Sequence, residues 1–228
     1  MRYFSLIRDG VDVDPFLAEI AAVSDAWELA TGRQEKIRVQ REALGIPLRG
    51  LRKSALRGRP RRDVHESRWT SGSAAFPTAR RFITSTAAAL DCQPGRAKIV
   101  SLPPGKRVYP HIDRGDYYRL HARFHLVLHS PAGSLLRAGD ELQRMQPGEL
   151  WWFDNKQIHE AWNDGDDHRV HLIFDLMPNS HRQQAFGEAP VAPQHLSVAT
   201  QREVTRAALR QPATRALRST SPMPEVPT

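Results

Sequence analysis

The spacing of apolar residues changes near residue 97 of the chain. Before that point, apolar residues recur every three to four positions in two stretches, which is the period of an amphipathic helix. The first predicted helix spans residues 14–30, with Asp14 as the N-cap and a proline at the first helical position. The second begins at Pro77 and is closed by Pro94-Gly95. The N-terminal part therefore supplies helices that can cover one face of a sheet.

From residue 97 onward, apolar and polar residues alternate, which is the period of strands with one buried face. Glycine and proline turns separate the short apolar runs. We expect strands at residues 97–102, 107–111, 119–129, 134–137, 141–145, 149–153 and 170–176, with a further strand at 1–7 and strand fragments within 39–51. Many short strands at this spacing favour an antiparallel sandwich or barrel.

The length of 228 residues suits one domain with an appendage. We expect residues 1–96 to form helices and strands that pack on a core made by residues 97–177. The C-terminal extension, residues 178–228, is predicted to hold one helix at 200–209 and to be largely disordered after about residue 210.

Hydrophobic residues make up 40% of the chain and charged residues 25%, which is typical of a globular protein. The formal net charge is +8, and arginines gather in residues 49–68 and in the last fifty residues. A solvated arginine-rich surface, with an exposed loop at 52–63, is the favoured interpretation. Nucleic-acid binding stays an alternative, although the sequence has no recognised nucleic-acid motif.

Cys92 is the single cysteine, so no internal disulfide and no paired-cysteine zinc site is expected. The apolar start of the chain is too short for a signal peptide, and no run reaches the ~20 apolar residues of a membrane span. These features predict a cytoplasmic protein without a membrane partner.

Candidate chemistry lies between residues 110 and 175. His111 and Asp113 are two positions apart, so in an extended segment their side chains project to the same side. If His159 joins them from a neighbouring strand, two imidazoles and one carboxylate leave the opposite face of a metal open. That is the ligand set of a non-haem Fe(II) centre which also binds a co-substrate and O2. For the His111–Asp113 pair alone, a turn with a capped aspartate is the alternative.

Arg169 is a charged residue at the start of an otherwise apolar run, where a buried charge needs a partner. A bound dicarboxylate would supply one through a bidentate contact, and a salt bridge to Asp164, Asp166 or Asp167 is the alternative. Alternate positions of the predicted strand 119–129 form a basic face: Arg119, His121, Arg123 and His125. This face would favour anions beside a metal; an exposed polar face is the alternative, more so for its first two residues.

Several motifs in the same order resemble those of the aspartyl/asparaginyl β-hydroxylase family. They are Pro110-His111, Arg123-Phe124-His125-Leu126, residues 148–154, residues 159–163 and Arg169. The resemblance covers residues 97–177 and implies a mainly β protein with flanking helices around a double-stranded β-helix (jelly-roll, cupin-like) core. It also implies Fe(II) and the co-substrates 2-oxoglutarate and O2.

The resemblance assigns roles to individual positions. His111 and His159 match the two histidine iron ligands, and Arg169 matches the arginine that holds the distal carboxylate of 2-oxoglutarate. Arg123 and His125 match a pair that also touches the co-substrate, and Ser101 matches a serine near that site. The best-known animal members have glycine at the position of Asp113, whereas this chain has the complete ligand set of related bacterial hydroxylases of free amino acids.

The implied activity is hydroxylation of a C–H bond in an amino acid, or in an amino-acid residue (Asp/Asn or Pro type) of a peptide or protein. The expected partner is thus a small amino-acid or peptide substrate, and neither nucleic acid nor membrane is expected. A non-catalytic cupin-like module that binds a metal or a small acid is the alternative.

Overall fold

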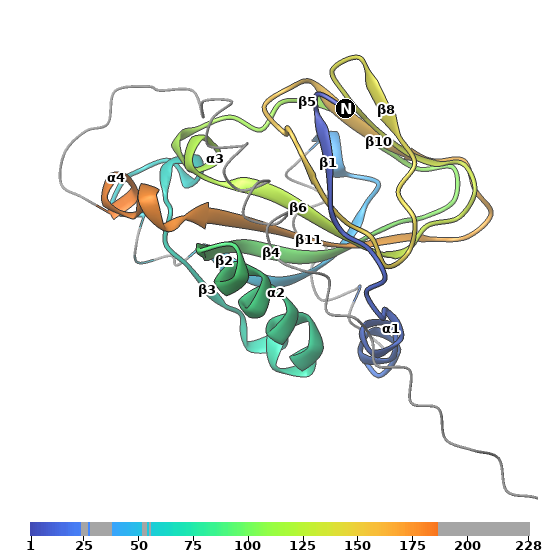
Figure 1. The fold of residues 1–228 in the computed structure, drawn as a ribbon, viewed down its shortest axis with the longest axis horizontal. Helices are drawn as coiled ribbons and strands as arrows, with labels where there is room; N and C mark the ends of the chain where they lie inside the picture. Colours follow the sequence, from blue (N-terminus) through green and yellow to red (C-terminus); the bar gives the residue numbers. More distant parts are fainter. Residues whose placement is uncertain (24–26, 28–37, 52–53, 55, 187–228) are drawn as a thin grey trace, which may run out of the picture.

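The computed structural model describes residues 1–23, 27, 38–51, 54 and 56–186, and within them two antiparallel sheets face each other (Figure 1). The larger sheet has the order β1 (Phe4–Arg8), β9 (Leu150–Phe153), β6 (Ala122–His129), β11 (Arg169–Pro178), β4 (Cys92–Leu102), β2 (Leu44–Leu51) and β3 (Ser67–Trp69). The smaller has the order β5 (Arg107–His111), β10 (His159–Asn163), β7 (Ser134–Ala138) and β8 (Glu141–Gln143). The prediction of a mainly β jelly-roll core with flanking helices is confirmed.

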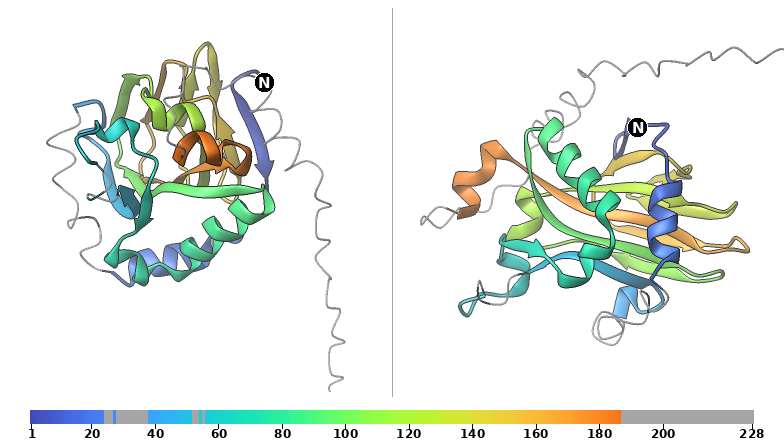
Figure 2. Two further views of the ribbon diagram at one scale, coloured as in Figure 1. Left: turned by 90° about the vertical axis from the view of Figure 1, so that its left-hand side faces the viewer. Right: turned by 90° about the horizontal axis from the view of Figure 1, so that it is seen from below.

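One face of the larger sheet is covered by α1 (Asp14–Ala21) and α2 (Pro77–Ala89), which lie side by side in Figure 2. Alternate residues of the central strands point toward these helices, as the two-residue period requires. Phe124 and Phe174 stack across β6 and β11, and Phe82 of α2 meets Phe174 edge to face. This buried layer fixes the central strands and thereby the side chains on their opposite face.

The opposite face of the larger sheet packs against the smaller sheet through a second apolar cluster. Phe4, Val127, Trp151 and Phe153 from the larger sheet meet Ala161 and residues of β7 there. Toward β5 and β11 the interior between the sheets becomes polar, and the candidate residues lie at that end. The remaining short helices are α3 (Asp116–Leu120), α4 (Arg182–Phe186) and 3-10 turns at Arg38–Gln40, Arg61–Asp63, Ser71–Ala75 and Asn179–His181.

The N-terminal helix differs from its prediction. α1 ends at Ala21, and Asp14 lies inside it, preceded by Val13 at the N-cap without a side-chain cap bond. The carboxylate of Asp12 instead accepts the backbone N–H of Asp14 at 3.1 Å. Residues 24–26 and 28–30 of the predicted helix lie outside the described residues.

Three further expectations are wrong in detail. Pro94-Gly95 does not close α2 but lies within β4, which begins at Cys92. The fragments expected within residues 39–51 form one strand, β2, with an irregularity after Pro47. Arg49 is not part of a solvated loop, because its Nε donates to the Gly95 carbonyl at 2.9 Å and its guanidinium lies 4.6 Å from the Trp69 ring centroid.

The strand expected at residues 119–129 begins only at Ala122, and its first part is the helix α3. Gly115 precedes this helix with φ +112°, and a Cβ there would lie 2.7 Å from the Arg62 carbonyl oxygen. A glycine is therefore required for the turn into α3. The predictions for the 200–209 helix and for the C-terminal tail lie outside the described residues.

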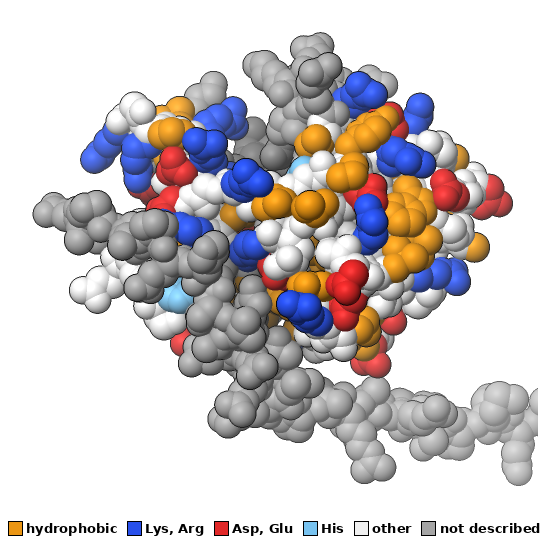
Figure 3. All heavy atoms as spheres, turned by 90° about the horizontal axis from the view of Figure 1, so that it is seen from above, with side chains coloured by type: hydrophobic (Ala, Val, Ile, Leu, Met, Phe, Trp, Pro, Cys, Tyr) orange, Lys and Arg blue, Asp and Glu red, His pale blue; other side chains and the backbone are white. Residues whose placement is uncertain are grey.

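None of the helices in the described part of the chain has the length and apolar character needed to cross a bilayer. Lys and Arg side chains on the face in Figure 3 are interspersed with acidic and apolar ones. The arginines of the 57–62 segment are exposed, as expected for a solvated loop. The domain division and the cytoplasmic location stay predictions.

Gly95 lies so close to Tyr117 and His121 that a substitution there tests the packing around α3. A Cβ at Gly95 would lie 2.5 Å from the Tyr117 hydroxyl, 2.7 Å from His121 Cδ2 and 3.0 Å from the Asp175 carbonyl oxygen. We expect Gly95→Ala to lower the free energy of unfolding by about 1–3 kcal/mol through overpacking, measured by denaturant titration. Gly45→Ala, also within a strand but with its nearest atom at 3.8 Å, is the control. If the two substitutions lower the free energy of unfolding equally, overpacking at Gly95 is not the cause.

Candidate metal centre

The pairing of β5 with β10 brings three possible metal ligands together. His111 ends β5, His159 begins β10, and the two residues are direct cross-strand partners with ring centroids 4.2 Å apart. Asp113 follows two residues after His111, and its backbone N–H donates to the Asn155 carbonyl at 3.1 Å. One potential ligand atom from each of the three residues lies within 4.8 Å of the others.

Hydrogen bonds fix which nitrogen of each imidazole faces a metal. Nδ1 of His111 lies 2.7 Å from the Tyr109 carbonyl, and Nδ1 of His159 lies 3.0 Å from the Gln157 carbonyl. A carbonyl only accepts, so each Nδ1 carries the hydrogen and each Nε2 keeps its lone pair. Metal-bound histidines usually have this arrangement, in which the second nitrogen donates to a fixed acceptor.

Asp113 is held by two donors that use the same oxygen. Arg123 Nη1 donates to Oδ2 at 2.7 Å, and Asn155 Nδ2 donates to it at 2.8 Å. The same oxygen lies 3.9 Å from His159 Nε2. Burial alone raises the pKa of Asp113, but Arg123, His159 and Asn155 outweigh it and bring the pKa to about 2. The carboxylate is therefore ionised at neutral pH, and the donor set fits Fe(II).

Arg123 is buried and bound to acids on both sides. Its Nε and Nη2 donate to Asp175 at 2.8 and 3.1 Å, in addition to the contact with Asp113. Its guanidinium also lies 5.1 Å from the centroid of the Tyr118 ring. The structure thus places Arg123 beside a metal ligand, and its predicted contact with the co-substrate stays a prediction.

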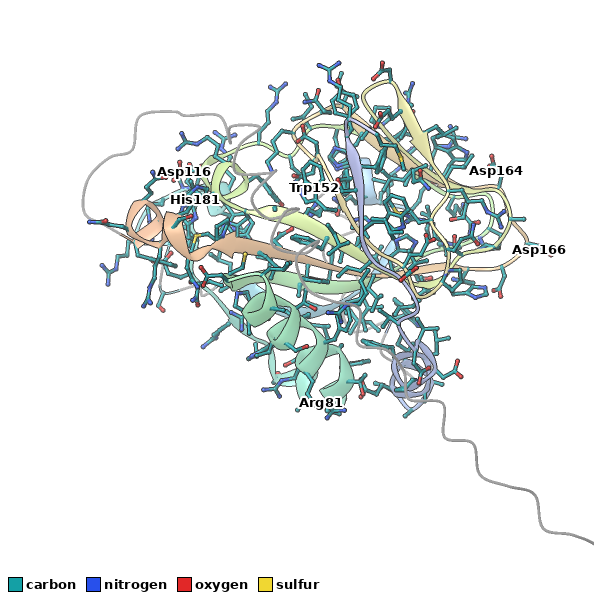
Figure 4. The ribbon with its side chains drawn as sticks, in the orientation of Figure 1. Arg81, Asp116, Trp152, Asp164, Asp166 and His181 are labelled. Carbon is teal, nitrogen blue, oxygen red and sulfur yellow. The ribbon has the colours of Figure 1, made fainter. Side chains whose placement is uncertain are left out.

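Arg169 lies at the start of β11, is 4% exposed and forms no ion pair with any acid among the described residues. Burial lowers its pKa to about 10. Asp164 and Asp166 are exposed in the turn between β10 and β11 (Figure 4), and Asp167 pairs with His129. The predicted alternative of a salt bridge to one of these aspartates is therefore not observed.

Buried aromatic and imidazole rings connect Arg169 with the metal ligands. Arg169 Nη2 lies 3.4 Å from His171 Nδ1, which lies 3.3 Å from His125 Nδ1. The Phe153 ring then contacts both His125 and His159, with centroids 5.0 and 5.2 Å apart. Arg169 and His125 accordingly line the same polar end of the interior as the ligand set.

Ser101 is not brought to this cluster. It pairs with Val170 across β4 and β11, so its side chain lies on the helix-covered face of the sheet, opposite to the face of Arg169. Its hydroxyl contacts His168 Nδ1 at 2.7 Å. The role of Ser101 near the co-substrate stays a prediction without a contact that supports it.

The alternative that Arg119 and His121 lie on an exposed polar face is wrong for His121. His121 is buried and stacks on Tyr117, with centroids 3.8 Å apart. Arg119 lies on α3 and pairs with Asp116. Tyr117 is fully buried, and its hydroxyl donates to Asp175.

Sequence reasoning missed three residues of the site: Asn155, His171 and Asp175. Asp175 carries a detectable signal, because it is a charged residue within an apolar run, like Arg169. The Asp154 carboxylate accepts from Lys156 N and Gln157 Nε2 within its own turn.

The buried histidines predict loss of stability in acid. Burial lowers the pKa of His121 and His171 well below the ordinary value of 6.5. Their contribution is complete above pH 6.5, the value in the unfolded chain, and is lost as the pH falls toward the lower folded pKa. At about 1.4 kcal/mol for each group and pH unit, we expect these two histidines alone to remove about 2–3 kcal/mol of stability between pH 7.5 and pH 5.5. The lowered pKa values of His65, His125 and His159 act in the same direction, so the total loss, measured by denaturant unfolding of the metal-free protein, should be larger.

Two variants separate this effect from general acid sensitivity. His121→Gln removes one titrating group, so its stability should depend less steeply on pH. His129→Gln, at a half-exposed histidine, should keep the slope of the wild type. An unchanged slope in His121→Gln would contradict the assignment.

Comparison with known proteins gives one family match and many structural matches. The model of the family described as aspartyl/asparaginyl beta-hydroxylase matches residues 59–178. A search of curated protein sequences finds no match to the chain.

Among solved structures, similarity extends over most of the chain. A prolyl hydroxylase from Trichoplax adhaerens, in complex with a hypoxia inducible factor peptide fragment, is 12% identical with a TM-score of 0.52, covering 81% of this chain and 88% of that one. AviO1 from Streptomyces viridochromogenes is 13% identical with a TM-score of 0.47, covering 84% and 93%. At such identities the first of these matches supports the fold alone.

Proposed function

Because the chain belongs to the aspartyl/asparaginyl beta-hydroxylase family, it is a hydroxylase, and we propose that it uses Fe(II), 2-oxoglutarate and O2 to hydroxylate a C–H bond of an amino acid or of an amino-acid residue in a peptide. The match covers more than half of the chain, 120 of 228 residues (59–178). The family resemblance found in the sequence is thereby confirmed.

The convergence of His111, Asp113 and His159 carries the proposal for the metal. Each imidazole has its Nδ1–H directed to a backbone carbonyl, and the Asp113 carboxylate is ionised and fixed by Arg123 and Asn155. In this role the three side chains hold Fe(II) on one face and leave the opposite face open for the co-substrate and O2.

Arg169 is the proposed partner of the distal carboxylate of 2-oxoglutarate. A buried guanidinium without an acid partner among the described residues is costly, and a bound dicarboxylate would neutralise it. His171 and His125 stay neutral beside it, because burial lowers the pKa of both. They add no positive charge that would compete with Arg169 for the anion.

When bound, iron supplies the oxidative chemistry that converts 2-oxoglutarate and O2 into succinate and CO2 and a substrate C–H into C–OH. The protein orients the reactants and excludes water. Phe153 and Trp151 form the apolar wall at the inner end of the site. The buried interior between the sheets strengthens each charge contact relative to water.

A screen for succinate release tests the proposal. The protein is incubated with Fe(II), ascorbate and 2-oxoglutarate, and free amino acids and short peptides are added in turn. We expect a subset of them to stimulate succinate formation and O2 consumption, and to gain one oxygen atom by mass spectrometry. A protein that binds metal and 2-oxoglutarate but consumes no O2 with any compound would instead fit the non-catalytic binding module.

A further inference from the structure

The Arg123 guanidinium is shared between two buried carboxylates on different elements. Arg123 of β6 and Asp175 of β11 are direct cross-strand partners, and two parallel N–H···O bonds of 2.8 and 3.1 Å join them. The third bond of Arg123, 2.7 Å long, goes to Asp113. A bidentate arginine–carboxylate pair is both strong and geometrically restrictive, so Asp175 fixes where the guanidinium lies.

A second donor holds Asp175 itself. The Tyr117 hydroxyl donates to Asp175 Oδ2 at 3.1 Å, and the same hydroxyl accepts the backbone N–H of Arg96 at 2.7 Å. Asp175 is 2% exposed and lies on a central strand of the larger sheet. The carboxylate is therefore anchored to the rigid part of the fold, while Asp113 lies in the loop that follows an edge strand.

Charge balance gives this arrangement a consequence for the metal. Arg123 attracts Asp113, and a metal ion competes for the same carboxylate. With Asp175 present, two negative charges share one guanidinium, so the hold of Arg123 on Asp113 is weakened. Without Asp175, the full positive charge would face Asp113 in a buried site, where it is poorly screened.

We propose that Asp175 is a positioning residue of the metal centre: by binding Arg123 bidentately, it lets Arg123 orient Asp113 while leaving that carboxylate available to the metal. The inference rests on the proposed function, in which Asp113 is a metal ligand. Asp175 touches neither metal nor substrate in this role and acts through Arg123.

The test measures metal affinity rather than turnover. Co(II) is titrated into the co-substrate-free full-length protein, and its visible absorption reports both the dissociation constant and the ligand set. Asp175→Asn should weaken Co(II) binding by about 10–100-fold, the usual effect of removing a group that supports a metal ligand. Tyr117→Phe, which keeps both charges but removes one bond to Asp175, should weaken binding in the same direction by a smaller factor and serves if Asp175→Asn does not fold.

A pair of double variants separates positioning from general charge. Arg123→Met with Asp175→Leu removes both partners, so Co(II) binding should be tighter than in Asp175→Asn, although weaker than in the wild type because Arg123 no longer orients Asp113. The double variant Lys156→Met, Asp175→Asn also removes one positive and one negative charge. It keeps Arg123, which then lacks the Asp175 carboxylate as its partner. Lys156 bonds the His121 carbonyl and is half-buried near Asp113, so this variant should stay as weak as Asp175→Asn.

Either of two results would overturn the inference: equal recovery in both double variants, or unchanged Co(II) affinity in Asp175→Asn. Different results would contradict the proposed function itself: a wild-type protein that binds no Co(II), or a His159→Ala protein that binds Co(II) as tightly as the wild type.

Discussion

His159→Ala protein is expected to remain folded but to lose metal binding and hydroxylation. The side chain supplies one of three converging ligands, and its one hydrogen bond is to the Gln157 carbonyl. Supporting groups around a metal cost about 10–100-fold in affinity when removed, so loss of a ligand should exceed about 100-fold. Anaerobic Co(II) or Fe(II) titration and succinate release measure the two effects.

The matched control for His159→Ala is His129→Ala. His129 is half-exposed and pairs with Asp167 outside the cluster, so its removal should change metal affinity less than threefold. Circular dichroism of both variants reports whether the sheets are retained. A folded His159→Ala protein with wild-type metal affinity would show that the three side chains do not form the metal site.

Arg169→Leu should weaken the binding of 2-oxoglutarate without lowering the stability of the protein. Losing a buried charged partner of a carboxylate costs about 3–5 kcal/mol, which corresponds to about 10²- to 4 × 10³-fold in the affinity for 2-oxoglutarate. The protein without co-substrate should be as stable as the wild type or more so, because an unpaired buried charge has been replaced by an apolar group.

Two measurements on Arg169→Leu test this combination. The dissociation constant of 2-oxoglutarate is obtained anaerobically with the metal present, and the free energy of unfolding is measured without either. Arg137→Leu is the control, since Arg137 is exposed and pairs with Glu160. An unchanged requirement for 2-oxoglutarate would place the distal carboxylate elsewhere, whereas a large loss of stability would give Arg169 a structural role.

The metal ligands could be predicted because residue type and spacing both constrain them. His111 and Asp113 share one side of an extended segment, and His159 completes a recognisable ligand set only with them. Most strands were predictable from their two-residue period, but β10 and β3 were not among the predicted strands. No local sequence pattern indicated that β5 pairs with β10. That His159 lies on a strand next to His111 was expected only because the three residues together make a known metal-ligand set.

Long-range packing explains what the sequence alone could not give. Arg119 and Leu120 continue the alternating pattern of the strand that follows them, yet they belong to a helix that begins where Gly115 turns the chain against Arg62. His121 is buried because Gly95, on a strand distant in sequence, leaves space for it and for Tyr117. The two acids that bind Arg123, Asp113 and Asp175, come from separate segments, and only the strand register of β6 and β11 identifies Asp175 as a partner.

The position of β5 at the border of the smaller sheet has a mechanical consequence. Its hydrogen bonds within the described sheets are all to β10, and the pair His111–His159 lies at the end of that ladder. An ion coordinated by both imidazoles would cross-link the two strands. Without the ion, the end of β5 can separate locally from β10. Amide protons of β5 should therefore exchange faster in the apoprotein, while those of β6 and β11 remain protected.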